Sequence, residues 1–418
     1  MKTTMSHPCS LETAERSLEW ARERDYAGYD PYDGLNSPIL SSVATNWFTR
    51  LVAIHGVNKS PVNLRPLLGI EPERNPKGIG LFASACLRLY EATGKETYLT
   101  EAEQLLGWLT EQTSPVTDRN AWGYNFDWQN ARRFFLPAYH PSIVVTVFCA
   151  RAFLEHHELT GAAWSLEVAE DAAAYIREEI NVVTVDGFDA YTYTPYDEFV
   201  VINANALAAA FFLRLSDHTD DDASPTYTDD ESLSGRATEL FEFVLHAQDD
   251  SGAWYYSMPA SDSHLSHDNF HTGFVLESLH EYATSDLGND RARKAYEDGL
   301  EFYVRELFEA DGAPKFESDT SKPYDAHASA QALITLIQSD DSDANEVAAR
   351  VYDWSIANLY DSEGYFYRRI GRFFDDETPY IRWSQGWMTL ALATLARAQA
   401  VHDETPEFTD RIGVPAEE

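Results

Sequence analysis

The sequence contains few cysteines, and this shortage restricts what the protein can be. Its 418 residues include only Cys9, Cys86 and Cys149, which are odd in number and far apart. They form neither a disulfide framework nor a zinc motif, and such usage fits a reducing compartment. The first twenty residues also lack the apolar core of a signal peptide. We therefore expect a cytoplasmic protein.

Basic charge is also scarce. The chain has 31 Lys and Arg against 69 Asp and Glu, a net charge of −38, and only seven of the basic residues are Lys. Because the acid is dispersed and aromatic residues are abundant, we expect a folded, acidic protein with a solvated acidic surface, typical of a halophilic organism. The sign of the charge opposes nucleic acid, whose phosphates require Lys and Arg, and it also disfavours anionic membrane surfaces.

Long hydrophobic runs are absent from the sequence. The longest uncharged apolar run, Phe199 to Leu213, has 15 residues and includes two Asn. A helix that spans a membrane needs about 18–20 apolar residues. We therefore expect no membrane span and interpret this run as a helix buried within the protein.

An internal repeat is the main feature that the sequence does contain. Its clearest copy, residues 236–282, is a polar helix, an Asp/Gly turn, an aromatic loop and an apolar helix. About six such copies occur, and repetition on this scale indicates a repeat or ring architecture. The turn glycines are Gly34, Gly123, Gly187, Gly252, Gly312 and Gly364, of which the last five are spaced by 64, 65, 60 and 52 residues.

Two classes of helix alternate along the repeats. A helix that is apolar on nearly all faces must be surrounded by protein, whereas a helix that is apolar on one face lies at the edge. This alternation predicts an all-α (α/α)6 toroid, in which twelve or thirteen helices form a single domain over residues 1–401. Residues 402–418 are expected to be a C-terminal tail. An open α-solenoid is the alternative architecture.

Polar and aromatic residues collect where the inner helices begin. Each inner helix follows a long loop, so these starts meet at one end of the ring, where helix N-termini add partial positive charge. Flat aromatic rings beside carboxylates, amides and Arg suit a saccharide or glycan. The candidate substrate-binding residues are Trp122, His140, Asp189, Tyr324, Arg382, Trp383 and Trp387.

Two reaction types remain open at this end of the ring. Glycoside hydrolysis, which we favour, uses a pair of carboxyl groups, and Asp268 and Asp325 are the acid/base candidates. A uronate epimerase or lyase would instead use a His or Tyr base. Asp268 and Asp325 are explained equally well as helix N-caps. The full set of candidate catalytic residues is Asp268, Asp325, Asp127, His271 and His327.

A metal site receives little support from the sequence. His267 and His271 have the spacing of two ligands on one helix face, but the adjacent Glu of a zinc protease motif is missing and no third ligand is evident. We therefore expect neither a metal nor a cofactor.

Three segments resemble the VpsJ-like polysaccharide biosynthesis proteins. They are Trp122 to Gln129, Asp268 to Phe274 and Ser384 to Trp387, and the resemblance spans about residues 70–400. It implies a six-hairpin (α/α)6 protein that acts on surface polysaccharide or glycoprotein glycan. The motifs mark the family rather than a reaction, so they assign no catalytic role. A non-catalytic glycan-binding or scaffold protein of the same pathway is the alternative to an enzyme, and the oligomeric state is left open.

Overall fold

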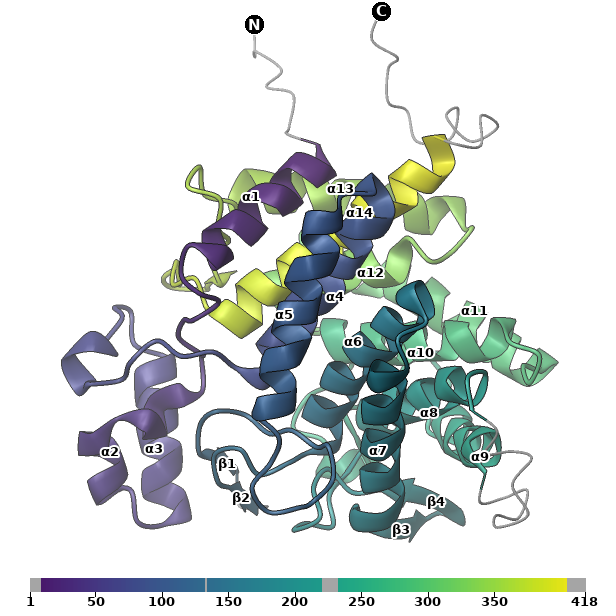
Figure 1. Ribbon diagram of the computed structural model, residues 1–418, viewed down its shortest axis with the longest axis horizontal. Helices are drawn as coiled ribbons and strands as arrows, with labels where there is room; N and C mark the ends of the chain where they lie inside the picture. The colour runs from purple at the N-terminus through teal and green to yellow at the C-terminus, as the bar shows by residue number, and fades with distance from the viewer. Residues whose placement is uncertain (1–8, 132–133, 220–231, 404–418) are drawn as a thin grey trace, which may run out of the picture.

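Twelve helices form two concentric layers in the computed structural model, which describes residues 9–131, 134–219 and 232–403 (Figure 1). The inner helices are α4 (Pro76–Thr93), α6 (Ile143–Thr160), α8 (Ile202–Ser216), α10 (Asn269–Thr284), α12 (Ala326–Leu336) and α14 (Trp387–Asp403). The outer helices are α1 (Ser10–Arg22), α5 (Glu96–Glu111), α7 (Ala163–Glu179), α9 (Leu233–His246), α11 (Asp290–Glu306) and α13 (Ser342–Asn358).

The inner layer is a closed ring. Each inner helix packs against the next, and α14 packs against both α4 and the outer helix α1. The predicted (α/α)6 toroid is therefore confirmed, and the open solenoid is wrong. Helix α14 extends to Asp403, and residues 404–418 of the expected tail lie outside the described residues.

Burial explains why the two layers differ in sequence. In α8 nearly every side chain is buried, and five of its residues are Ala, which lets neighbouring helices approach closely. The acidic helix α11, in contrast, buries only the stripe that faces the ring. The long apolar run found in the sequence is thus a helix enclosed by protein, as predicted. Among the described helices, none combines the length and the apolar character that crossing a bilayer demands.

Four of the six turn glycines share one backbone conformation. Gly187, Gly252, Gly312 and Gly364 have φ values of +92°, +88°, +94° and +96°, which L-residues with side chains rarely adopt. At Gly312 a Cβ atom would also lie 2.4 Å from the backbone of the next outer helix. Gly34 differs, because it lies in the short helix η1 (Asp33–Asn36) rather than between an outer and an inner helix.

Short antiparallel strand pairs brace the loop end of the ring. They were not predicted, because segments of two to four residues show no periodic pattern. Two of the pairs are hairpins, and the other two connect loops of successive repeats. The pairs are β1 (Trp128–Asn130) with β2 (Phe134–Leu136), β3 (Val182–Val185) with β4 (Phe188–Tyr191), β5 (Val200–Val201) with β6 (Ser257–Met258), and β7 (Tyr324–Asp325) with β8 (Arg369–Ile370).

A small lobe lies beside the ring, at the lower left of Figure 1. It contains α2 (Pro38–Val43), α3 (Trp47–Asn58) and the short helix η2 (Pro66–Leu68). Helices α2 and α3 are separate because the side chain of Asn46 caps the start of α3.

Candidate functional site

Two buried carboxylates cap neighbouring inner helices at the loop end. Asp268 Oδ1 accepts a hydrogen bond from the backbone N of His271 (3.1 Å) at the start of α10, and Asp325 Oδ1 accepts one from the backbone N of His327 (2.9 Å) at the start of α12. Their exposed fractions are 1% and 4%. The capping role is therefore present, and burial gives both carboxylates further contacts.

Asp268 also forms a dyad with a histidine. Its Oδ2 atom lies 2.9 Å from His271 Nδ1, and His271 is half-buried against the ring of Phe270 (4.1 Å between centroids). A carboxylate at Nδ1 fixes the imidazole tautomer and leaves Nε2 for proton exchange. Asp268 therefore orients His271, which makes His271 the better candidate for a base.

His327 lies between two aromatic rings. The ring of Phe270 stacks on it at 4.4 Å and 18°, and the indole of Trp387 stacks on it at 4.5 Å and 24°. Both ring nitrogens are buried without a hydrogen-bond partner in the described part of the chain. Burial, followed by the nearby Lys77 and Arg382, holds the pKa of His327 well below its usual value. The imidazole is thus neutral and has one N–H to donate and one lone pair to accept.

Lys77 completes this aromatic cluster. It stands in the first turn of α4, is 3% exposed, and its Nζ atom lies 4.0 Å from the centroid of Phe148 and 5.2 Å from that of Trp387. Its interactions with other described residues include no salt bridge, and burial followed by Arg382 lowers its pKa well below the usual value. An amine held in this way costs stability, so its presence points to a role in binding or catalysis.

Lys77 was not among the residues chosen from the sequence. A signal for it exists, because it is one of only seven Lys and lies at the start of an apolar inner helix. The helix dipole disfavours a cation at that position. The position of Lys77 therefore indicates a functional role more strongly than the position of a lysine on an outer helix does.

Trp383 and Arg382 lie next to α12. Trp383 Nε1 donates to Asp325 Oδ1 (2.8 Å), and burial raises the pKa of Asp325 although Arg368 opposes the rise. The guanidinium of Arg382 donates twice to Asp30, at 2.6 and 2.9 Å. Burial lowers the pKa of Arg382, but Asp30 outweighs this and the net shift is upward. Arg382 is thus a fixed cation rather than a free clamp for substrate.

Trp122 and Tyr324 point away from this cluster. Trp122 is fully buried, donates from Nε1 to the carbonyl of Leu109 on α5, and stacks on Phe153. The hydroxyl of Tyr324 lies 3.4 Å from Glu309, and its ring contacts Trp354 on α13. Both side chains connect inner elements of the fold to outer helices and lie outside the aromatic cluster.

The other three candidates occupy separate places on the loop end. Asp127 accepts a hydrogen bond from the backbone N of residue 138 (2.8 Å), and the half-buried His140 contacts the ring of Tyr196. Asp189 is exposed on β4, where Thr184 donates to it. Asp189 therefore lies on the surface, away from the aromatic cluster.

The two histidines with metal-ligand spacing have different partners. His267 precedes α10, and its Nε2 atom lies 2.8 Å from Asp249 Oδ2, whereas His271 pairs with Asp268. Within the described ranges, no three His, Cys, Asp or Glu side chains gather as a metal ion would require. The two rings with metal-ligand spacing thus contact different carboxylates.

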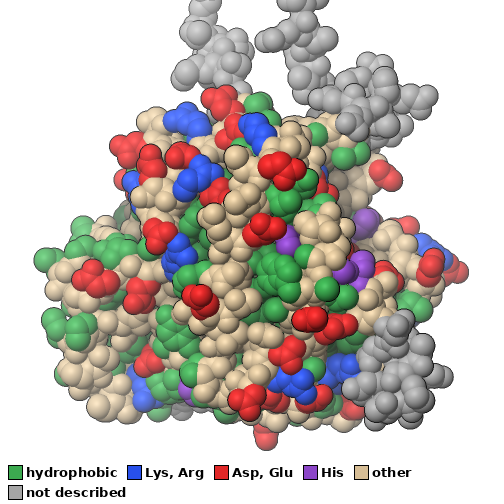
Figure 2. Space-filling model, in the orientation of Figure 1, with side chains coloured by type: hydrophobic (Ala, Val, Ile, Leu, Met, Phe, Trp, Pro, Cys, Tyr) green, Lys and Arg blue, Asp and Glu red, His purple; other side chains and the backbone are tan. Residues whose placement is uncertain are grey.

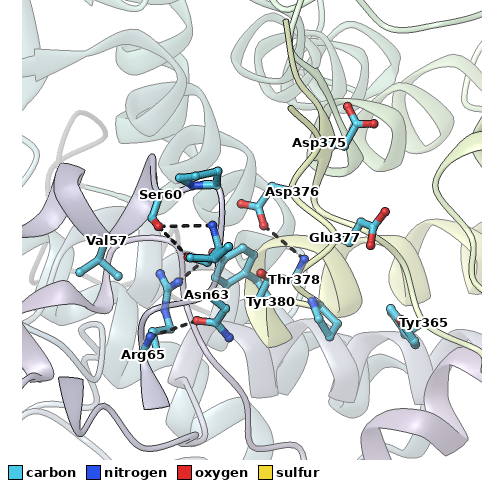
Figure 3. Close-up of a pocket in the computed structure, with 13 residues that line it drawn as sticks. Val57, Ser60, Asn63, Arg65, Tyr365, Asp375, Asp376, Glu377, Thr378 and Tyr380 are labelled. Carbon is cyan, nitrogen blue, oxygen red and sulfur yellow. Dashed lines mark hydrogen bonds between the residues drawn. The ribbon is translucent and has the colours of Figure 1, made fainter. Parts of the chain in front are cut away.

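A cavity of about 330 Å³ lies between the lobe and the loop before α14 (Figure 3). Its walls are the end of α3 with residues 60–65 on one side and residues 375–380 on the other. Arg65 donates to the hydroxyl of Tyr380 (2.9 Å) at its base, and Asp376 contacts Arg368 (3.0 Å). None of the twelve residues predicted for the site lines this cavity.

Comparison with known proteins identifies the same fold in solved structures. A cellobiose 2-epimerase from Bacillus thermoamylovorans has 13% identity and a TM-score of 0.57, over 77% of this chain and 87% of its own. A Listeria innocua protein has 12% identity and a TM-score of 0.62, over 94% and 99%. An α-mannanase from Bacteroides thetaiotaomicron has 10% identity and a TM-score of 0.56, over 78% and 87%. No protein-family model and no curated protein sequence matches the chain.

Proposed function

We propose that this protein is a carbohydrate-active enzyme that moves a proton on a sugar bound at the loop end of the ring. The observation that carries the proposal is the pairing of Asp268 with His271 at 2.9 Å, next to the buried imidazole of His327, whose ring nitrogens have no hydrogen-bond partner among the described residues. Phe270 contacts both imidazoles, with ring centroids 4.1 and 4.4 Å away. Two imidazoles beside an aromatic platform suit proton removal and return on a sugar ring or chain.

The proton transfer balances without an added reactant. His271 Nε2 takes a proton from the carbon next to a carbonyl or carboxylate, and the C–H electron pair moves to the oxygen as an enediolate. The imidazolium of His271 then returns the proton to the neighbouring carbon while the hydroxyl proton moves to the first oxygen, which gives an isomer and restores His271. The neutral His327 keeps its N–H and donates it as a hydrogen bond to the substrate oxygen. We assign to Lys77 Nζ, which lies 5.2 Å from the centroid of the Trp387 ring that stacks on His327, a hydrogen bond to the enediolate oxygen.

Hydrolysis by a carboxylate pair is the second candidate, and one observation favours it. Burial raises the pKa of Asp325, as a general acid requires. Its Oδ1 atom, however, already accepts from Trp383 and from the backbone of His327, and Asp268 is engaged twice by His271. Because both carboxylates act as fixed acceptors, the proton-transfer reaction is better supported.

The nature of the structural neighbours supports a saccharide ligand. They include a cellobiose 2-epimerase and a D-mannose isomerase as well as an α-mannanase. The aromatic cluster of this chain occupies the loop end of the same kind of ring. We place the enzyme, as the resemblance to VpsJ-like proteins implies, in surface polysaccharide or glycoprotein-glycan synthesis, in the cytoplasm of a salt-adapted cell.

Solvent exchange tests the proposal. Cellobiose, mannose and glucuronic acid would each be incubated with the protein in D2O and followed by NMR. We expect deuterium to enter at the carbon next to the carbonyl or carboxylate, and we expect His271→Gln and His327→Gln to lose this exchange with unchanged helical circular dichroism. His246→Gln is the matched control, because His246 stacks on Phe188 away from the site.

Each other outcome identifies an alternative. Release of a shorter saccharide without deuterium entry would establish hydrolysis and contradict proton transfer as the reaction. Binding of a saccharide without exchange or cleavage at long incubation would establish the non-catalytic protein. Full exchange by both His variants would remove the two imidazoles from the mechanism.

A further inference from the structure

The lobe beside the ring departs from the acidic composition of the rest of the chain. Residues 34–70, which we call the acid-free lobe, contain no Asp and no Glu. The whole chain has 69 acidic residues in 418, or about one in six, so that 37 residues would carry about six by this average. A stretch without any acidic residue therefore indicates a surface whose role differs from that of the acidic, solvent-exposed surface of the rest of the chain.

The same lobe exposes large apolar side chains. Helix α3, which packs on η1 and β1, buries Ala53, Ile54 and Val57, yet its opposite face carries Phe48 and Val52 with exposed fractions of 58% and 56%. A helix that is apolar on opposite faces is normally covered on both. The exposed large apolar residues of the lobe are Ile39, Val43, Trp47, Phe48, Val52, Val62 and Leu67.

These side chains belong to one region of the surface. Helices α2 and α3 are in contact, and α2 also contacts η2, which carries Leu67. Helix α2 has no buried residue although Ile39, Leu40 and Val43 are apolar. Figure 2 shows hydrophobic side chains gathered at the left, where Figure 1 places the lobe. Apolar patches of this kind mark interaction sites in soluble proteins.

The cations of the lobe argue against an anionic lipid surface as its partner. Arg65 is buried and donates to Asp33 at 2.7 Å, so its charge is neutralised within the protein. The guanidinium of Arg50 lies 3.7 Å from the centroid of Phe135. Only Lys59 of the three cations is left exposed on the surface of the lobe, in a chain whose net charge is −38. A basic cluster that would hold anionic headgroups is therefore missing from the lobe.

We propose that the acid-free lobe is the contact surface of a homodimer. Two copies that each carry a net charge of −38 repel one another wherever acidic surfaces meet, and this repulsion is weakest where both surfaces lack acid. A two-fold axis through the lobe brings Phe48 and Val52 of one copy against the α2–α3 surface of the other, since a two-fold interface uses the same patch on both subunits. The exposed face of α3 is then covered as its composition requires.

The dimer contact borders the cavity of Figure 3. Val57, Ser60, Val62 and Arg65 line that cavity and belong to the lobe. Association through the exposed face of α3 therefore holds one wall of the cavity in place without covering the aromatic cluster of the ring.

Sedimentation equilibrium of the full chain tests this inference. We expect a mass of 94.4 kDa, twice the 47.2 kDa of the chain, at high protein concentration. Added salt should strengthen the dimer, because it screens the repulsion between acidic surfaces and leaves the apolar contact intact. Phe48→Asp and Val52→Glu should each give a 47.2 kDa monomer with unchanged circular dichroism.

A matched variant separates the lobe from apolar exposure in general. Phe373 is 85% exposed and lies outside the lobe, so Phe373→Asp should remain dimeric. A wild-type chain that stays monomeric in high salt at the highest concentration would overturn the proposal, as would a Phe48→Asp variant that stays dimeric. Flotation of a monomeric wild-type chain with phosphatidylglycerol vesicles would overturn it in favour of a lipid surface.

Discussion

Replacing Lys77 with Met should make the protein more stable and less active. Removing an ammonium group from water costs several kcal/mol, whereas an aromatic face returns about 0.5–2 kcal/mol to a cation. The rings of Phe148 and Trp387 around Nζ therefore offset only part of the cost. Methionine fills a similar volume without charge, so we expect Lys77→Met to raise the free energy of unfolding by about 1–3 kcal/mol at neutral pH.

The gain should depend on pH with a definite sign. The unfolded chain keeps the Lys77 proton up to the ordinary pKa of 10.5, whereas burial lets the folded chain release it at lower pH. Between these two values the unfolded state binds more protons, so the stability of the wild type rises with pH. The Met variant lacks this titration, and its advantage should shrink as pH approaches 10.5.

Urea unfolding followed by circular dichroism at several pH values measures both effects. Lys294→Met is the control, because Lys294 is exposed in a pair with Asp298 and its removal should leave the stability nearly unchanged. In the exchange assay proposed above, Lys77→Met should lose at least about tenfold in rate, as expected when a buried donor to the reacting oxygen is removed. A Met variant that is less stable than the wild type at neutral pH would refute the reasoning.

Two further predictions concern the ring itself. Gly312→Ala should lower the free energy of unfolding by more than about 1 kcal/mol, because the residue has a φ of +94° and an added Cβ would meet Arg350. Urea unfolding measures this change, and Gly107→Ala is the control because a Cβ added at Gly107 would meet no atom within 4 Å. Burial raises the pKa of Glu155, but Arg88 and other cations outweigh burial and lower the pKa to about 2, against 4.5 in the unfolded chain. The contribution of Glu155 to the stability is therefore complete above pH 4.5 and is lost as the pH falls toward 2. Glu155→Gln should remove about 3 kcal/mol at neutral pH and flatten the acid limb of a stability–pH profile, and an unchanged acid limb would contradict the assignment.

The ring could be predicted from sequence because its cause is local. The apolar pattern of each helix determines whether it joins the inner or the outer layer, and this pattern can be read without knowledge of contacts between distant residues. The same logic brought Asp268, His271, Asp325 and His327 to one end, since each belongs to the first turn of an inner helix or to its N-cap.

Side-chain direction beyond those first turns could not be predicted in this way. Asp189 faces solvent because of its position in a strand pair that no periodic pattern revealed. Trp122 turns into the layer between helices, where the carbonyl of Leu109 accepts from it. The pair of Asp30 with Arg382 joins residues 352 positions apart, a contact that no local pattern encodes.

The contact of α1 with α14 has a consequence for synthesis of the chain. Until α14 leaves the ribosome, α4 and α12 each lack one neighbour and α1 lacks the helix on which it packs. A nascent chain that ends before residue 387 therefore exposes apolar surface on both sides of the unfinished gap, which invites aggregation or capture by chaperones. Completion of the last helix, rather than of any single hairpin, is the event that makes the fold self-sufficient.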